Sequence, residues 1–191
     1  MIDPTARAMA SLCARAYVDP PTYGAADSAG RAHLYGADVV FRGTDNPASM
    51  LADGDILTAD TPLGKLHDGF WQAWLPIEAP LLGRSPQRIA GHSEGAALAV
   101  IYAGMLCHIG KPPSIVYCFE PPRLCMDDTL RGILDRAGVT VFATCCCIDP
   151  VPWVPPLMSF PGELAHIGKF DPAHLDPVWY HLIANVEAAL A

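Results

Sequence analysis

Short apolar runs alternate with longer helical patterns along most of the chain. The apolar runs predict strands at 37–41, 87–90, 114–119 and 139–148, and the helical periodicity predicts helices at 4–17, 70–82, 94–109, 127–137 and 177–190. Pro76 and Pro80 predict that the second helix is kinked or ends early. Segments 43–66 and 149–176 are expected to be irregular. Apolar strands that alternate with helices are typical of a mainly parallel sheet covered on both faces, so the pattern predicts an α/β fold.

The composition excludes several classes of protein. The chain has 191 residues, which predicts a single domain spanning 1–191. Apolar residues make up 51% and charged residues 17%, which excludes a disordered chain. The net charge of −8 without a basic cluster argues against nucleic acid as a partner. No apolar stretch is long enough to span or insert stably in a membrane, and the first residues lack a signal-peptide pattern, so we expect a cytoplasmic protein.

The seven cysteines do not indicate a metal or redox site. Their number is odd, no C-x-x-C spacing occurs, and residues 145–147 continue an apolar run. Buried free thiols, which behave as small hydrophobic groups, fit this pattern and a reducing compartment. We therefore expect no metal and no cofactor.

The strongest chemical signal is the sequence Gly91-His92-Ser93-Glu94-Gly95, which lies between a predicted strand and an apolar helix. It fits the G-x-S-x-G pattern of a nucleophile elbow, in which a serine hydroxyl projects from a tight turn. Glycines at both ends avoid Cβ clashes between strand and helix. Ser93 is therefore a candidate nucleophile, and the N–H of Glu94, at the helix start, is a candidate oxyanion donor.

A nucleophilic serine needs a histidine base and an acid that orients it. In this arrangement the acid follows a later strand and the histidine comes last. Asp149 follows the strand predicted at 139–148 and is the best-placed acid. Spacing alone does not choose among the three histidines that follow it: His166, His174 and His181.

Five blocks, in this order, resemble blocks of the class 3 lipase family of α/β-hydrolases: 40–44 (VFRGT), 67–70 (HDGF), 91–98 (GHSEGAAL), 119–123 (FEPPR) and 149–156 (DPVPWVPP). The resemblance implies a minimal α/β-hydrolase fold and a serine carboxylic ester hydrolase that acts through an acyl-enzyme on a small-molecule ester or lipid. It makes Ser93 the nucleophile and Asp149 the acid, and Thr44 would complete the oxyanion hole with Glu94.

The resemblance also ranks the histidines. The run that begins at His181 resembles the family's closing "HxxxxYxxAL" pattern, which favours His181 as the base. His174, which also lies near the closing helix, is the alternate base. His166 resembles a structural histidine that follows the family's "LPP" block.

Three departures from the family pattern bear on the site. Glu94 stands in place of a leucine beside the nucleophile, where a carboxylate would oppose developing negative charge. Glu120 replaces the glycine of the "FGxPR" block. Segment 45–66 is the only candidate lid and has few apolar residues, which predicts an open site that hydrolyses small soluble esters without interfacial activation.

Two other functions fit the same sequence features. The same serine chemistry would serve an amidase, thioesterase or acyltransferase. Glu94 and the choice between histidines also leave room for a non-catalytic α/β-hydrolase-fold protein that binds a ligand. The sequence does not indicate an oligomeric state.

Overall fold

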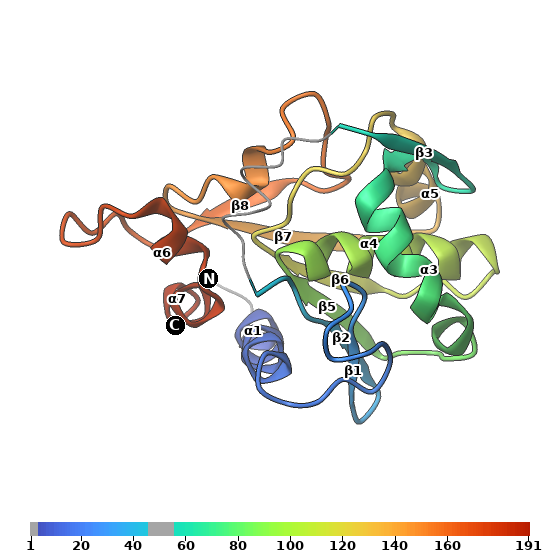
Figure 1. Cartoon of the computed structure of the whole chain (residues 1–191), viewed down its shortest axis with the longest axis horizontal. Helices are drawn as coiled ribbons and strands as arrows, with labels where there is room; N and C mark the ends of the chain where they lie inside the picture. Colours follow the sequence, from blue (N-terminus) through green and yellow to red (C-terminus); the bar gives the residue numbers. More distant parts are fainter. Residues whose placement is uncertain (1–3, 46–55) are drawn as a thin grey trace.

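A computed structural model describes residues 4–45 and 56–191. Within them, six strands form one sheet in the order β1-β2-β5-β6-β7-β8 (Figure 1). Only β1 is antiparallel to its neighbour, and the remaining strands are parallel. The strands are β1 (Ala32–Tyr35), β2 (Asp38–Phe41), β5 (Arg88–His92), β6 (Ile115–Phe119), β7 (Thr140–Cys146) and β8 (Leu164–Ile167). The mainly parallel sheet confirms the predicted α/β class.

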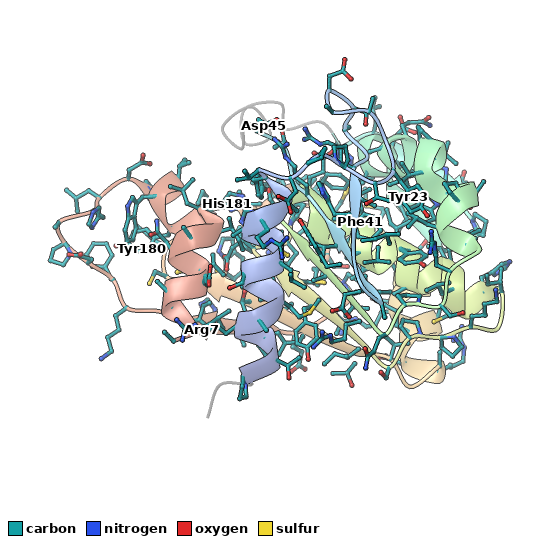
Figure 2. All side chains as sticks on the ribbon, turned by 90° about the horizontal axis from the view of Figure 1, so that it is seen from below. Arg7, Tyr23, Phe41, Asp45, Tyr180 and His181 are labelled. Carbon is teal, nitrogen blue, oxygen red and sulfur yellow. The ribbon has the colours of Figure 1, made fainter. Side chains whose placement is uncertain are left out.

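Helices cover both faces of this sheet. On one face lie α3 (Asp68–Leu82), α4 (Glu94–His108) and α5 (Thr129–Arg136). On the other lie α1 (Pro4–Ala16), α6 (Pro177–His181) and α7 (Ile183–Ala189), with α1 beside the closing helices (Figure 1, Figure 2). Each central strand is buried from both sides because its successive side chains enter opposite cores, as Val39 and Val40 do.

Four short strands lie where the sequence predicted irregular structure or none. β3 (Thr58–Thr61) and β4 (Gly64–His67) form a separate antiparallel hairpin that overlaps the end of segment 43–66, and β8 lies within the proline-rich segment 149–176. The fourth is β1, which pairs with β2 through a short turn. None of these strands is an apolar run, which is why the pattern missed them.

The prediction that prolines end α3 early is wrong. The helix continues through Pro76 and Pro80 to Leu82. Both prolines are exposed and lie four residues apart, hence on one solvent-facing side of the helix. Water can satisfy the carbonyls that lose a helical partner there, while Trp74, Ile77 and Leu81 bury the opposite side.

The single closing helix predicted at 177–190 is interrupted. It divides into α6 and α7 at Leu182, whose φ of −63° and ψ of 127° are extended rather than helical. The Nε2 atom of His92 lies 2.8 Å from the carbonyl oxygen of His181, which is therefore turned out of the helical ladder. A tertiary hydrogen bond thus accompanies the break. No helix in the described part of the chain has the length and apolar character needed to cross a bilayer.

Candidate active site

Ser93 occupies the turn between β5 and α4. Its φ is 57° and its ψ −131°, a conformation that L-residues seldom adopt and that nucleophile elbows use. The Ser93 N–H donates to the carbonyl of Phe119 on β6 at 2.9 Å, which fixes the turn against the sheet. A Cβ at Gly91 would lie 2.0 Å from the carbonyl oxygen of Gly95, and one at Gly95 would lie 2.3 Å from that of Phe41. These approaches require glycine at both positions.

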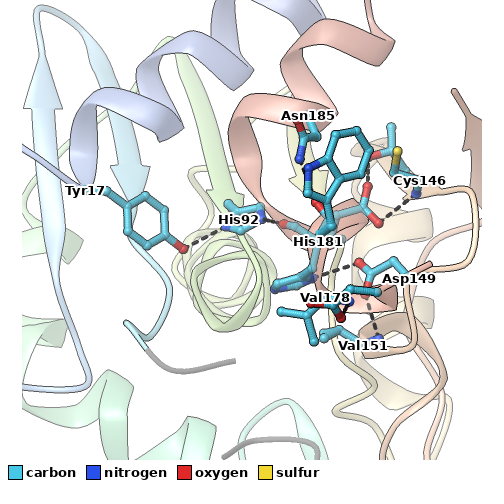
Figure 3. A network of polar contacts seen from close by, with 12 residues as sticks. Tyr17, His92, Cys146, Asp149, Val151, Val178, His181 and Asn185 are labelled. Atoms are coloured by element: carbon cyan, nitrogen blue, oxygen red, sulfur yellow. Dashed lines mark hydrogen bonds and ion pairs between the residues drawn. The ribbon is translucent and has the colours of Figure 1, made fainter. Parts of the chain in front are cut away.

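The acid and the base meet in the interior. Asp149 follows β7, just before the 3₁₀ turn η1 (Val151–Trp153). Its Oδ1 accepts from the N–H of Val151 at 2.9 Å, and its Oδ2 lies 2.7 Å from Nδ1 of His181 (Figure 3). The two side chains are 0% and 2% exposed. Because a carboxylate only accepts, Nδ1 of His181 carries a proton, and in the neutral ring Nε2 is then the nitrogen with the lone pair.

The remaining reactive atoms of this set are buried and unpaired. Neither Oγ of Ser93 nor Nε2 of His181 has a hydrogen-bond partner among the described residues. The His181 ring lies 4.8 Å, centroid to centroid, from the ring of His92, the residue next to Ser93. Buried unpaired polar atoms are rare in folded proteins, and here they are the atoms that a serine–histidine reaction would use.

The other two histidines lie away from Asp149. His174 pairs with Asp171, with 3.0 Å between Nδ1 and Oδ2, and stacks on Trp179 at 4.0 Å. His166 is exposed on β8 and stacks against Trp153. The geometry therefore brings His181, and neither His174 nor His166, to the acid.

The segment that carries Thr44 packs directly on the elbow. A Cβ at Gly43 would lie 2.9 Å from the Cβ of Ser93, so only glycine lets the two segments approach this closely. The buried Arg31 donates from Nη2 to the carbonyl of Gly43 at 2.9 Å. Glu94 is the first residue of α4, where an N–H has no acceptor within the helix. Both predicted oxyanion donors therefore belong to segments that contact the nucleophile.

The side chain of Glu94 differs from the ionised carboxylate that the sequence led us to expect, because its pKa is raised. Burial raises its pKa from 4.5 to about 7, and the nearby Arg31 only partly offsets this. The raised pKa favours the uncharged acid beside the nucleophile more than it would at an exposed glutamate.

A hydrogen-bonded chain that the sequence did not predict supports the base. The hydroxyl of Tyr17 lies 2.7 Å from Nδ1 of His92, and Nε2 of His92 meets the carbonyl of His181 (Figure 3). Burial lowers the pKa of His92 well below its usual value, so the ring is neutral. The carbonyl can only accept, hence Nε2 donates and Nδ1 accepts from Tyr17. Nothing in the sequence singled out Tyr17, because it is the polar end of an ordinary helix.

Glu120 is a second residue whose role the sequence did not reveal. It lies directly after β6, is 0% exposed and has a φ of 52°. Its two carboxyl oxygens contact Thr144 and Cys146 of β7. The one signal available was its substitution for a glycine in the resembling family block.

A cavity of about 320 Å³ opens beside the base. Its lining includes Thr44, His92, His181 and apolar groups of 182–184. Within residues 4–45 and 56–191, no group of three or more histidine, cysteine, aspartate or glutamate side chains could hold a metal ion. Ten residues of the predicted lid segment, 46–55, lie outside the described residues, so the lidless expectation stays a prediction.

Solved structures share this fold. The native Rhizomucor miehei lipase propeptide complex has a TM-score of 0.70 at 19% identity, over 85% of this chain and 67% of that one. A mutant form of MDLA from Penicillium cyclopium has a TM-score of 0.65 at 20% identity, over 91% and 80%. A deletion mutant of the Rhizomucor complex has a TM-score of 0.62 at 24% identity, over 69% of this chain and only 48% of that one. These likenesses identify the α/β-hydrolase fold.

The sequence comparison is more specific. Curated proteins gave no match. The family model described as "Lipase (class 3)" matches residues 38–159, which is well over half of the chain. The matched region includes the elbow, the Thr44 segment and Asp149, and it ends before His181. The chain therefore belongs to the class 3 lipase family.

Proposed function

We propose that the protein is a serine carboxylic ester hydrolase in which Ser93 is the nucleophile, His181 the base and Asp149 the acid. The N–H groups of Thr44 and Glu94 would bind the oxyanion. The observation that carries the proposal is the buried 2.7 Å contact between Asp149 and His181, which leaves Nε2 of His181 free beside the elbow.

The reaction follows from these positions. Nε2 of His181 accepts the hydroxyl proton of Ser93 as Oγ bonds to the ester carbonyl carbon. The carbonyl oxygen becomes an oxyanion, to which the two N–H groups donate. His181 then protonates the departing alcohol, leaving an acyl-enzyme. Water, activated by the same nitrogen, releases the acid and restores Ser93, while Asp149 orients the ring.

The cavity favours small esters. Its volume of about 320 Å³ lies at the low end of the roughly 300–1,000 Å³ that small-molecule sites occupy. We propose that short-chain, soluble esters are hydrolysed without a rate increase at a lipid surface. A sharp rise in rate when a short-chain ester exceeds its solubility would contradict this part of the proposal.

The first experiment compares hydrolysis of a short p-nitrophenyl ester by the wild type, Ser93→Ala and His181→Ala. His174→Ala is the matched control, since it removes another C-terminal histidine that pairs with an aspartate. We expect the first two variants to lose at least about 1,000-fold in kcat/KM while staying folded by circular dichroism. His174→Ala should stay within about threefold of the wild type, in line with substitutions away from buried features.

The wild type should also lose activity in acid, because a protonated histidine cannot accept the serine proton. A flat profile between pH 5 and 8 would contradict a histidine base.

Faster hydrolysis of a matched thioester or amide than of the ester would reassign the substrate class. An inactive wild type that a fluorophosphonate fails to label would favour the non-catalytic alternative.

A further inference from the structure

Glu120 is a buried carboxyl group held against the strand that carries the proposed triad acid. It directly follows β6, and its N–H donates to the carbonyl of Thr144 at 3.2 Å. Its Oε2 accepts from the N–H of Cys146 at 2.8 Å, a contact drawn in Figure 3, and its Oε1 lies 3.1 Å from the hydroxyl of Thr144. The side chain is therefore fixed at both oxygens.

The backbone at this position is strained for glutamate. A φ of 52° lies in the left-handed region, where glycine is comfortable and a side chain is not. Glycine would also avoid the burial of a carboxyl group. The contacts of the Glu120 side chain with Thr144 and Cys146 maintain this strained backbone.

The surroundings favour an uncharged acid. No arginine, lysine or histidine among the described residues pairs with Glu120. Burial, a hydrogen bond with Asp149 and the charge of Asp149 together raise the pKa of Glu120 well above its usual value. The other titratable neighbours are the thiols of β7, and burial raises the pKa of Cys145 to about 12 and that of Cys146 further, so both are neutral.

The contact between Glu120 and Asp149 needs one proton. Two carboxylates only accept, so they cannot hydrogen-bond to each other unless one is protonated. Asp149 already accepts from the N–H of Val151 and from Nδ1–H of His181. A proton shared by the pair therefore resides on Glu120, because only the protonated side chain of Glu120 can donate a hydrogen bond to the Asp149 carboxylate.

We propose that Glu120 is a positioning residue of the triad, whose carboxylic acid donates a hydrogen bond to Asp149 and holds it as the acceptor for His181. The proposal rests on the proposed function, in which Asp149 is the triad acid. The donor stabilises the carboxylate form of Asp149 and restricts its orientation. Without it, Asp149 turns more freely and holds a protonated His181 more strongly.

Infrared spectroscopy of the full chain tests the protonation state without using activity. At about pH 8, where Glu94 is mostly ionised, the wild type minus Glu120→Gln difference spectrum should contain the carbonyl stretch of a protonated carboxylic acid, shifted in D₂O. Glu94→Gln is the matched control, because its difference band should fade as pH rises through about 7. A carboxylate band in place of the acid band in the Glu120 spectrum would overturn the proposal.

Kinetics test the positioning role. Glu120→Gln keeps a neutral donor and an acceptor in the same shape, so kcat should stay within about threefold of the wild type. Glu120→Gly suits the positive φ and removes the donor, so kcat should fall about tenfold with KM unchanged, as expected for one hydrogen bond to a charged group. The half-maximal pH of its acid limb should also rise, which a purely structural role would not cause.

Each outcome separates this proposal from the proposed function. Equal losses in Glu120→Gln and Glu120→Gly would overturn it, as would a wild-type kcat and pH profile in a folded Glu120→Gly. If Glu120→Gly fails to fold, the infrared spectrum and the pH profile of Glu120→Gln decide. If instead Ser93→Ala keeps full activity, the proposed function fails whatever Glu120 does.

Discussion

Glu94 could affect the reaction in two ways, because its N–H is a proposed oxyanion donor and its side chain is a half-buried acid. Burial brings the pKa of that side chain to about 7, so its charge changes within the ordinary working range of pH. An ionised carboxylate beside Ser93 opposes the negative charge that develops on the ester oxygen, whereas the neutral acid does not. The residue that seemed to argue against catalysis in the sequence is therefore compatible with it below about pH 7.

Glu94→Gln should remove this opposition at alkaline pH. We expect its kcat/KM to exceed that of the wild type severalfold at pH 8 and to equal it at pH 5.5, where the wild-type side chain is already neutral. The measurement is a pH profile of both proteins, with Glu163→Gln as a control for an exposed glutamate. A ratio that stays constant with pH would show that the charge of Glu94 does not reach the oxyanion.

The same substitution should change the pH dependence of stability. The pKa of Glu94 is raised on folding from 4.5 to about 7, so its contribution is fully present below about pH 4.5 and is lost as pH rises through 7. Glu94→Gln should therefore gain unfolding free energy relative to the wild type between pH 5 and 8, by at most about 3 kcal/mol. Urea unfolding at the two pH values measures this difference.

The segment after the first helix and the closing helices contact the elbow from two sides. The turn directly after α1 supplies the hydroxyl of Tyr17, the elbow supplies His92, and the end of α6 supplies the carbonyl of His181. The break at Leu182 allows this, since the carbonyl of His181 is then not committed to a continuing helix. Elements from the two ends of the chain thereby fix the backbone of the proposed base.

The Tyr17→Phe variant tests whether this hydrogen-bonded chain positions the proposed base. The variant keeps the ring but leaves Nδ1 of His92 without its donor, so we expect a loss of about 1 kcal/mol in stability and a severalfold fall in kcat. Tyr35→Phe is the matched control, because it removes a tyrosine hydroxyl that bonds to Asp19, away from the elbow. Equal effects of the two substitutions on kcat would mean that α1 does not position the base.

The sequence predicted the strands and helices whose structure depends mainly on their own residues. β5, β6 and β7 are apolar runs buried on both faces, and α4 is apolar nearly all round, so pattern and burial agree. β8 and the β3–β4 hairpin carry mixed side chains, and pairing with other segments forms them. The interruption of the closing helix was not predictable either, because its partner, His92, is 89 residues away.

The proposed site is formed by residues at the carboxyl ends of three neighbouring parallel strands. Ser93 follows β5, Glu120 follows β6 and Asp149 follows β7, an edge where α/β proteins commonly bind ligands. The positions of Ser93 and Asp149 could therefore be predicted once the strands were assigned. Spacing alone could not choose His181 over His174, because both lie near the closing helix and only tertiary packing separates them; the family resemblance was what favoured His181.

The two cores on either side of the sheet raise the question of whether they unfold together. Five of the seven thiols are at most 3% exposed: Cys13 lies on α1, and the others, on or near β6 and β7, are Cys118, Cys125, Cys145 and Cys146. Burial raises the pKa of all five, so they are unreactive in the folded protein. Their rates of modification therefore report how each part of the molecule opens.

If α1 is an integral part of the cooperative fold, a thiol reagent should modify the partly exposed Cys107 and Cys147 quickly and the five buried thiols slowly, at one common rate. Denaturant should make all seven react at once. The Cys13→Ala variant identifies the α1 thiol within the slow group. If Cys13 reacts much faster than Cys118, α1 detaches on its own, and the Tyr17–His92 bond that braces the base is broken and remade while the sheet stays folded.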